Sequence, residues 1–233
     1  RCKGECMHMI NIKCVDTYRG TSNTLLPIQQ VGTASKLLRS ADCYQQRFIK
    51  FDGVGIFHSY AELLHAALLE SNPAVTSFTP QPFFLRIGRR RYIPDCYYVL
   101  DGKRYVVELK PRGEFADEMK LPLEAFFDYE NIKFKVISND SVLEHELIAQ
   151  NWLRIIRVLI NARHEDTQVE EIRLWESFLI TPKAYLDDII SFSNRFSSRS
   201  REIALFRLIH KGKLTINFND RDIGINTEVS LCN

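Results

Sequence analysis

Two runs of mostly apolar residues lie close together in the middle of the chain, at residues 91–100 and 103–111. Tyrosine, valine and leucine recur in both runs, which is a composition typical of β-strands. The dipeptide Asp101-Gly102 separates them, and this sequence readily adopts the positive φ angles of a two-residue hairpin turn. We therefore predict two antiparallel strands joined by a tight turn.

Three charged residues interrupt this apolar pattern. Asp95 lies in the first predicted strand, and Glu108 and Lys110 lie in the second. Because strand side chains alternate between faces, Val106, Glu108 and Lys110 share one face, while Asp95 approaches Glu108 when the strands pair. Burial of such charges without compensation costs several kcal/mol, so the hairpin indicates a site that uses them.

Further elements are predicted around this hairpin from the same periodicity. They are a helix at about 42–50, a helix from Ser59 to about Ser71, extended segments at 75–78 and 81–87, a helix at 114–127 despite Pro122, and a strand at 132–137. Asn72-Pro73 is expected to end the second of these helices. The pattern predicts an α/β unit with a small mixed sheet flanked by helices.

The remainder of the chain is predicted to be mostly helical. After a polar break at 138–141, we expect helices at 142–162, 168–178, 182–194 (with Thr181 as N-cap and Pro182 at N1) and 199–210, and then strands at 214–218 and 223–229. Helices followed by a hairpin are typical of a winged-helix-like domain. We divide the chain into an N-terminal segment at 1–50, a core at 51–140 and a winged-helix-like C-terminal domain at 141–233.

Composition restricts the class of protein. With 233 residues, 45% of them hydrophobic and 26% charged, the chain matches ordinary globular proteins. It has no run of about 18 apolar residues and no signal-like opening segment, so we expect an intracellular protein without a membrane partner. The six cysteines are too few for a disulfide scaffold. Zinc ligands could come from Cys2, Cys6, His8 and Cys14, but their spacing matches no usual pattern and reduced thiols are preferred.

Basic residues gather in two places, although the formal net charge is only +2. One cluster spans 86–112, beside the carboxylates, and the other spans 195–213. This distribution suits the binding of a polyanion that runs past the carboxylates. The alternative is that the two clusters are only solvated faces of the protein. The candidate DNA-binding residues are Arg89, Arg90, Arg91, Arg112, Arg199, Arg201, Lys211 and Lys213.

The charged residues of the hairpin fit metal-dependent phosphodiester hydrolysis. Carboxylates hold Mg²⁺ through hard oxygen ligands, and Asp95, Glu108 and the backbone carbonyl of Leu109 can supply them. Lys110 can orient the attacking water or stabilise developing charge. The alternative is that Asp95 is a turn residue after Pro94, while Glu108 and Lys110 form an exposed ladder.

Glu62 is a third candidate carboxylate, on the helix that follows Ser59. Ser59-x-x-Glu62 is also a capping box, in which the glutamate only closes the helix terminus, so both interpretations stay open. The helix is apolar on all sides, which favours a buried position for Glu62. His65 could assist the site, but a lone histidine is more often a packed or hydrogen-bonded residue.

Taken in order, these motifs resemble the TnsA family of endonuclease subunits of heteromeric DNA transposases, which have a restriction-endonuclease-like PD-(D/E)XK fold. The resemblance is carried by Ser59-x-x-Glu62, Phe78-x-x-Gln81-Pro82, Arg91-Tyr-x-Pro-Asp95, Gly102 and Val107-Glu108-Leu-Lys110-Pro111. It covers roughly residues 35–115 well and the C-terminal part more loosely. It implies that Glu62, Asp95, Glu108 and Lys110 are the catalytic and metal-binding residues and that Gln81 supports the site. The best-known member has glutamine at the place of Glu108, where this chain has the acid typical of the wider fold.

The resemblance also implies a function and partners. We expect a Mg²⁺-dependent endonuclease, with Mn²⁺ as a substitute, that cleaves the 5′ strands at transposon ends in the bacterial cytoplasm. Its partners would be DNA of the transposon ends and flanking donor, a TnsB-like DDE transposase and a TnsC-like AAA+ ATPase. The alternatives are a stand-alone restriction or repair endonuclease and a non-catalytic DNA-binding assembly subunit.

Overall fold

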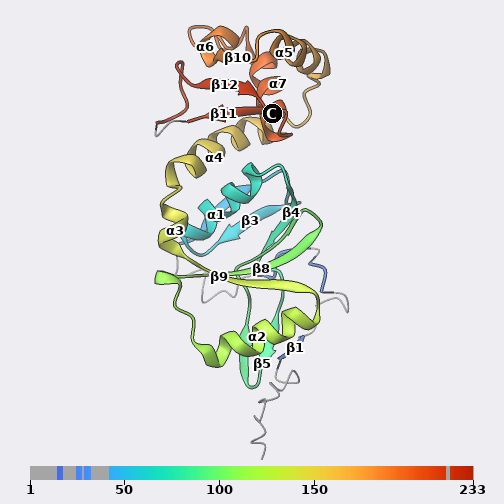
Figure 1. Ribbon diagram of the computed structural model, residues 1–233, viewed down its shortest axis with the longest axis vertical. Coiled ribbons are helices and arrows are strands. Elements are labelled where there is room, and N and C mark those ends of the chain that lie inside the picture. The colour runs from blue at the N-terminus through green and yellow to red at the C-terminus, as the bar shows by residue number, and fades with distance from the viewer. Residues whose placement is uncertain (1–14, 18–24, 28, 33–41, 219–220, 233) are drawn as a thin grey trace, which may run out of the picture.

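The computed structural model describes residues 15–17, 25–27, 29–32, 42–218 and 221–232. Small sheets, one of them mixed, are flanked by helices, so the fold is α/β (Figure 1). Most of the predicted segment 1–50 lies outside the described residues, as do the four positions considered for zinc, Cys2, Cys6, His8 and Cys14.

Most strands precede residue 139. In chain order the elements there are β1 (Val15–Thr17), β2 (Tyr44–Arg47), β3 (Val54–Phe57), α1 (Tyr60–Ser71), β4 (Val75–Pro80), β5 (Leu85–Ile87), β6 (Arg90–Tyr92), β7 (Cys96–Leu100), β8 (Lys103–Lys110), the 3-10 turn η3 (Pro111–Gly113), α2 (Asp117–Tyr129) and β9 (Ile132–Ser138). The elements that follow are α3 (Asn139–Leu143), α4 (Glu146–Asn161), α5 (Gln168–Ile180), β10 (Lys183–Tyr185), α6 (Leu186–Ile189), α7 (Arg199–His210), β11 (Leu214–Asn217) and β12 (Glu228–Leu231).

The main sheet has the strand order β4-β7-β8-β9. The first three strands are antiparallel, and β9 lies parallel to β8 after a crossover through α2. Asp101 and Gly102 have φ angles of 48° and 71°, which are the positive values that the sequence predicted for the β7–β8 turn. Side chains 105–109 of β8 are all buried, because both faces of the sheet are covered.

A separate hydrophobic core lies on each face of this sheet. On one face Tyr98, Tyr105 and Val107 belong to a core that includes α1 and α4 and extends into the C-terminal helices. On the other face Tyr97 and Val106 belong to a core shared with α2 and with β5 and β6. Figure 1 shows α1 and α2 on opposite sides of the sheet. Glu108 and Lys110 have the same parity as Val106 and therefore lie toward the second core.

The C-terminal elements are joined to α1 by direct contacts. The Nε2 atom of His210, at the end of α7, lies 2.6 Å from a carboxylate oxygen of Glu70, a residue of α1 with no exposed surface. Gly212 follows α7 with a φ of 70°, and a Cβ atom at this position would lie 2.7 Å from the ring of Pro73. These contacts and the shared core tie residues 141–232 to the sheet.

Several predicted elements are confirmed. The hairpin, α1 with its Ser59 N-cap, the extended segment that begins at Val75, α2 with Pro122 inside it, and β9 all occur near their predicted positions. In the C-terminal part α5 and α7 are confirmed, and Gly212 follows the end of α7 as expected.

Two predicted helices are wrong because strand pairing overrides the local pattern. Tyr44–Arg47 is strand β2, paired with β3, and no helix spans 42–50. Pro182 does not begin a long helix at 182–194: its carbonyl accepts the N–H of Leu231, β10 follows it, and α6 is a single short turn. The partner of β2 is the next strand along the chain, β3, whereas the partner of β10 is the distant strand β12.

Other predicted boundaries also move. The first predicted strand of the hairpin is interrupted at Ile93–Asp95, so that β6 pairs with β5 in a different sheet from β7. Ser138 is the N-cap of α3, and the predicted helix 142–162 is divided into α3 and α4. The predicted last strand begins later, at Glu228, because Gly224 and Thr227 form a turn before it.

Candidate active site

Asp95 and Glu108 lie beside each other where β7 begins and β8 ends. The register pairs Cys96 with Val107, so the residue before Cys96 lies opposite the residue after Val107. One carboxylate oxygen of Asp95 accepts the backbone N–H of Leu109 at 2.7 Å. Asp95 is half-buried, whereas Glu108 is only 3% exposed. The exposed ladder that was the alternative for Glu108 is therefore not what the structure contains.

Two donors hold the carboxylate of Glu108. The hydroxyl of Tyr92, the last residue of β6, donates to Oε2 at 2.6 Å, and the ammonium group of Lys110 lies 2.5 Å from Oε1. Lys110 is partly exposed and also lies 5.6 Å from the centroid of the Phe115 ring. Glu108 thus has a fixed orientation, with one partner on its own strand and one on the neighbouring sheet.

The two carboxyl groups are electrostatically strained. Burial raises the pKa of Asp95 well above its usual range, and the negative charges of Glu108 and Glu62 raise it further. Burial likewise raises the pKa of Glu108, although the hydrogen bonds from Lys110 and Tyr92 oppose this effect. Burial alone would lower the pKa of Lys110, but its contact with Glu108 raises it, so the lysine is held as a cation.

Glu62 closes the N-terminus of α1, and its charge still reaches the site. Its carboxylate accepts hydrogen bonds from the backbone N–H of His58 at 3.0 Å and from the hydroxyl of Ser59 at 2.9 Å. Ser59 caps α1 by accepting the backbone N–H of Glu62, but the carboxylate of Glu62 takes the N–H of His58 and not that of Ser59, so the capping box is formed only in part. The same charge contributes to the raised pKa values of Asp95, Glu108 and Lys110, which places Glu62 near all three. Both interpretations of this residue are compatible with the structure, because a carboxylate has about four lone-pair sites.

Gln81 connects the Asp95 backbone with the side chains of His58 and Gln30. Its backbone N–H donates to the carbonyl of Asp95 at 2.9 Å, and its side-chain amide nitrogen lies 2.7 Å from Nδ1 of His58. Its amide oxygen accepts from Gln30, whose side chain also bonds both backbone groups of Ile56. Gln81 is buried and has a φ of 44°, so its conformation is held by this network. The supporting position expected for Gln81 matches these contacts.

His65 lies in the first core instead of among the carboxylates. Its ring packs edge-to-face on Tyr98 with 6.4 Å between centroids, and it is 7% exposed. Burial lowers its pKa to about 4. The packed-residue alternative therefore describes its position, and the structure gives it no contact with Asp95 or Glu108.

Three residues of the site were not identified from the sequence, namely Tyr92, His58 and Gln30. Tyr92 belongs to the Arg91-Tyr-x-Pro-Asp95 motif, so a signal was present, but its partner Glu108 is sixteen positions away. His58 directly precedes the capping box. Gln30 lies far from every motif, and nothing in its surroundings indicates a role.

The oxygen donors suit a hard divalent cation. A cation between Asp95 and Glu108 would offset the burial and the carboxylate repulsion that raise their pKa values, and Glu62 can contribute a further oxygen. Leu109 lies next to Asp95, to which its backbone N–H donates, and the carbonyl of Leu109 is still only predicted to be a metal ligand. Within the described residues, no three His, Cys, Asp or Glu side chains are already gathered as a metal cluster. The donor chemistry fits Mg²⁺, while a bound ion would require these carboxylates to adjust their present hydrogen bonds.

The candidate DNA-binding residues fall into two groups. Arg89, Arg90 and Arg91 are exposed on the β5–β6 hairpin, and Arg112, with a φ of 56°, is exposed just after β8. The C-terminal candidates contact other side chains instead: Arg199 pairs with Glu165, Arg201 with Glu170 and Lys211 with Glu171, and Lys213 lies over the Trp175 ring. Acids largely neutralise this second basic cluster.

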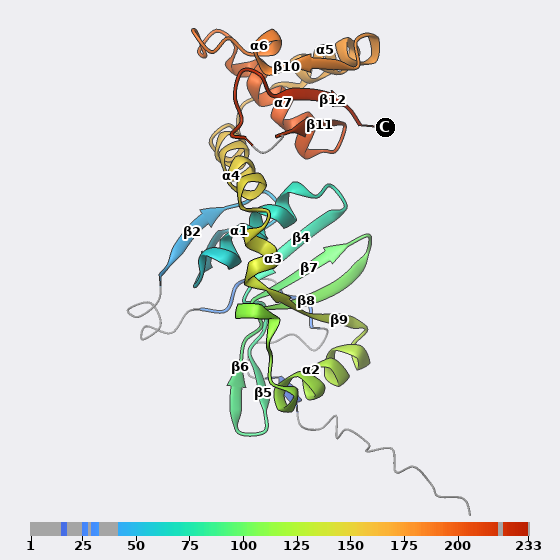
Figure 2. The same cartoon turned by 60° about the vertical axis from the view of Figure 1, so that its left-hand side comes forward.

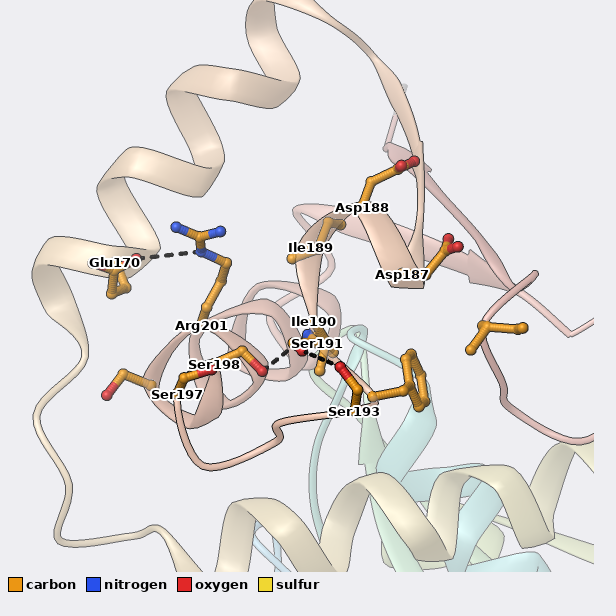
Figure 3. Close-up of a pocket in the computed structure, with 13 residues that line it drawn as sticks. Glu170, Asp187, Asp188, Ile189, Ile190, Ser191, Ser193, Ser197, Ser198 and Arg201 are labelled. Carbon is orange, nitrogen blue, oxygen red and sulfur yellow. Dashed lines mark hydrogen bonds and ion pairs between the residues drawn. The ribbon is translucent and has the colours of Figure 1, made fainter.

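A pocket of about 760 Å³ lies in the C-terminal part, among α5, α6 and the start of α7 (Figure 3). Glu170 and Arg201 face each other on one side of it, and the hydroxyl of Ser198 accepts the backbone N–H of Ser191. Its lining mixes acids, serines and one arginine and includes none of the predicted catalytic residues. The pocket is therefore separate from the candidate active site.

Across the described ranges, no helix combines the length and apolar character that crossing a membrane requires. Compared with known protein families and with curated proteins, the chain matches none of them significantly.

Proposed function

We propose that this chain is a Mg²⁺-dependent DNA endonuclease. The observation that carries the proposal is the pair of carboxylates at the end of the β7–β8 hairpin, Asp95 and Glu108, with the cation of Lys110 in contact with Glu108. Two acids kept together against their repulsion are costly to the fold unless a ligand uses them. Metal-assisted phosphodiester hydrolysis uses this set of groups.

The roles of the residues follow from their positions. Asp95 and Glu108, with Glu62 and the Leu109 carbonyl, would hold the metal, which when bound supplies a nucleophilic hydroxide and a counter-charge for the departing oxygen. Lys110, held as a cation, would orient the attacking water or stabilise charge on the phosphate. Gln81 would hold the backbone of Asp95 in place through its hydrogen bond.

The resemblance to the TnsA family narrows the proposal to cleavage of the 5′ strands at transposon ends. In this proposal the chain has a restriction-endonuclease-like core and acts in the bacterial cytoplasm beside a TnsB-like DDE transposase and a TnsC-like AAA+ ATPase. The order α5, β10, α6, α7, β11, β12 supports a winged-helix-like interpretation of the C-terminal part. However, α7 is largely buried, and its arginines are paired with acids in α5 or just before it, so the C-terminal part is a weaker candidate for DNA contact.

The test is cleavage of end-labelled duplex DNA with Mg²⁺ or Mn²⁺, with and without the transposase partner. We expect Asp95→Asn and Glu108→Gln each to lower the rate by about 100-fold or more, since a metal ligand contributes several kcal/mol to the transition state. Glu114→Gln is the matched control, because Glu114 is an exposed acid just after β8. Isothermal titration calorimetry with Ca²⁺ or Mn²⁺ measures metal binding independently of cleavage.

Each result separates the candidate functions. Cleavage of plain DNA without a partner would favour a stand-alone restriction or repair nuclease. Absence of both metal binding and cleavage would contradict the proposal and favour a non-catalytic assembly subunit. Full activity of Asp95→Asn would remove that residue from the mechanism.

A further inference from the structure

The β5–β6 hairpin, called the ribbon below, extends away from the main sheet (Figure 2), and β1 pairs with β5 to complete a three-stranded sheet. Leu85 pairs with Tyr92 and Ile87 with Arg90, and Gly88 and Arg89 form the tip. Gly88 has a φ of 59°, which allows the tight turn. The ribbon is therefore a defined element that continues directly into the candidate active site.

The ribbon combines buried apolar side chains with exposed arginines. Leu85, Ile87 and Tyr92 are buried in the second core and hold the ribbon against the body of the protein. The exposed side chains are all arginines, and residues 85–92 contain no acid. Their full set is Arg86, Arg89, Arg90 and Arg91. The register aligns Arg86 with Arg91 on one face and Arg90 with Ile87 on the other, so the positive charge lies on both faces of the ribbon.

The arginines nearest the tip are available to a ligand. Arg91 lies over the ring of Phe84, and Arg86 is aligned with Asp16 of β1. By contrast, Arg89 and Arg90 have no ion pair with any residue that the structure describes. The C-terminal arginines examined as alternatives, Arg199 and Arg201, are paired with acids. Arg89 and Arg90 are therefore the arginines best placed to bind a phosphate.

The ribbon is also connected to the carboxylates. Tyr92 ends β6, and its hydroxyl donates to Glu108 at 2.6 Å. Asp95 follows only three residues later. A ligand held by the ribbon would consequently lie at a fixed distance from Asp95 and Glu108.

We infer that the β5–β6 ribbon is a surface that holds duplex DNA, with Arg89 and Arg90 on backbone phosphates. The inference rests on the proposed nuclease function for the identity of the polyanion. Phosphate contacts of this kind position a duplex without reading its sequence. The ribbon would therefore fix the position of the duplex relative to the hairpin site.

The test measures binding without cleavage. Fluorescence anisotropy of a labelled DNA duplex is titrated with the full chain in the presence of EDTA, at several salt concentrations. We expect Arg89→Ala/Arg90→Ala to weaken binding roughly tenfold at low salt and to reduce the slope of log K against log salt by about 2, since each lost phosphate contact contributes about 0.9. Arg157→Ala/Arg173→Ala removes the same charge from exposed positions on α4 and α5 and should leave binding nearly unchanged.

Further measurements in the same experiment distinguish the ribbon inference from its alternatives. An unchanged affinity and salt slope in the ribbon variant would overturn the inference. An equal loss with the control variant would show a non-specific charge effect and overturn it as well. If the ribbon variant loses DNA binding but the wild type never cleaves with Mg²⁺ or Mn²⁺, the ribbon stands and the nuclease proposal fails. If cleavage depends on metal but is the same in the ribbon variant, the nuclease proposal stands and the ribbon inference fails.

Discussion

Asp95 is a carboxylic acid kept where its ionisation is opposed. Burial and the charges of Glu108 and Glu62 raise its pKa, and the Leu109 N–H and Lys110 compensate only in part. A position of this kind reduces stability at neutral pH, and proteins retain such positions mainly where the charge is used. Removal of this charge should therefore stabilise the folded chain.

Asp95→Asn should increase the stability of the folded chain at neutral pH. In the unfolded chain Asp95 ionises near its ordinary pKa of 3.8, while the folded chain retains the proton to higher pH. Wild-type stability is therefore lost as pH rises through this interval, and the asparagine variant avoids that loss. Urea unfolding should show the variant to be more stable than the wild type at pH 7, and this advantage should disappear below pH 3.8.

Added Mn²⁺ supplies the control for this prediction. Binding to the folded state should raise the melting temperature of the wild type and much less that of the variant. A variant that is less stable than the wild type at pH 7 would contradict the electrostatic account.

His65 should make the protein sensitive to mild acid. The unfolded chain binds a proton at this residue near pH 6.5, whereas the folded chain binds it only near pH 4. Stability should therefore fall as pH drops from 6.5 to 4, by up to about 3 kcal/mol. His65→Leu retains an apolar side chain in the core and should flatten the curve of unfolding free energy against pH in that interval. Identical pH slopes for the wild type and His65→Leu would contradict this role of His65.

At the scale of elements, the site is built where several strands end. The hairpin brings Asp95 and Glu108 together, α1 brings the charge of Glu62, and β6 brings the hydroxyl of Tyr92. The turn at Gln81 connects these parts through the Asp95 backbone. Tyr92 is the contact between the ribbon and the hairpin, so its hydroxyl can be tested alone.

Tyr92→Phe should disturb the site without unfolding the sheet. The phenylalanine ring keeps the packing in the second core, but Glu108 loses one of two donors. Because that hydrogen bond lowers the pKa of Glu108, its removal should raise the pKa. We expect cleavage to fall about tenfold at neutral pH and its acidic limb to move to higher pH, with activity partly restored in alkali. A uniform loss at every pH would point to a purely structural role.

At the scale of the whole molecule, one core crosses from the sheet into the C-terminal helices. It includes Tyr98 of β7, Leu64 of α1, Ile155 of α4 and Leu205 of α7. The contact between Glu70 and His210 lies at the same interface, next to Trp152. The two halves should therefore depend on each other for stability.

We expect a single unfolding transition for the full chain. Both tryptophans, Trp152 and Trp175, lie in the C-terminal half, whereas circular dichroism reports on all helices and strands. The midpoints of urea unfolding from tryptophan fluorescence and from circular dichroism should coincide. His210→Ala should lower both midpoints together and reduce the free energy of unfolding by about 1–3 kcal/mol, since it removes a partner of the buried Glu70. Two separate transitions would show independent domains.

Local patterns in the sequence were enough for a large part of the fold. The Asp101-Gly102 turn, the cap of α1 and the helical periodicity of α5 and α7 depend on neighbouring residues, and they occur as predicted. Strands β2 and β10 could not be predicted in this way. Each is short and depends on backbone hydrogen bonds to another strand, which is the following strand β3 for β2 and the distant strand β12 for β10.

The sequence by itself determined which chemical groups the site would contain. Alternation along two adjacent strands placed Glu108 and Lys110 on one face and brought Asp95 beside Glu108, because both effects follow from the two-residue period and the tight turn. Only the tertiary structure decided what surrounds these groups. It placed Tyr92 on Glu108, put His65 in the core and paired the C-terminal basic residues with acids, because such contacts join side chains whose separation in sequence carries no periodic signal.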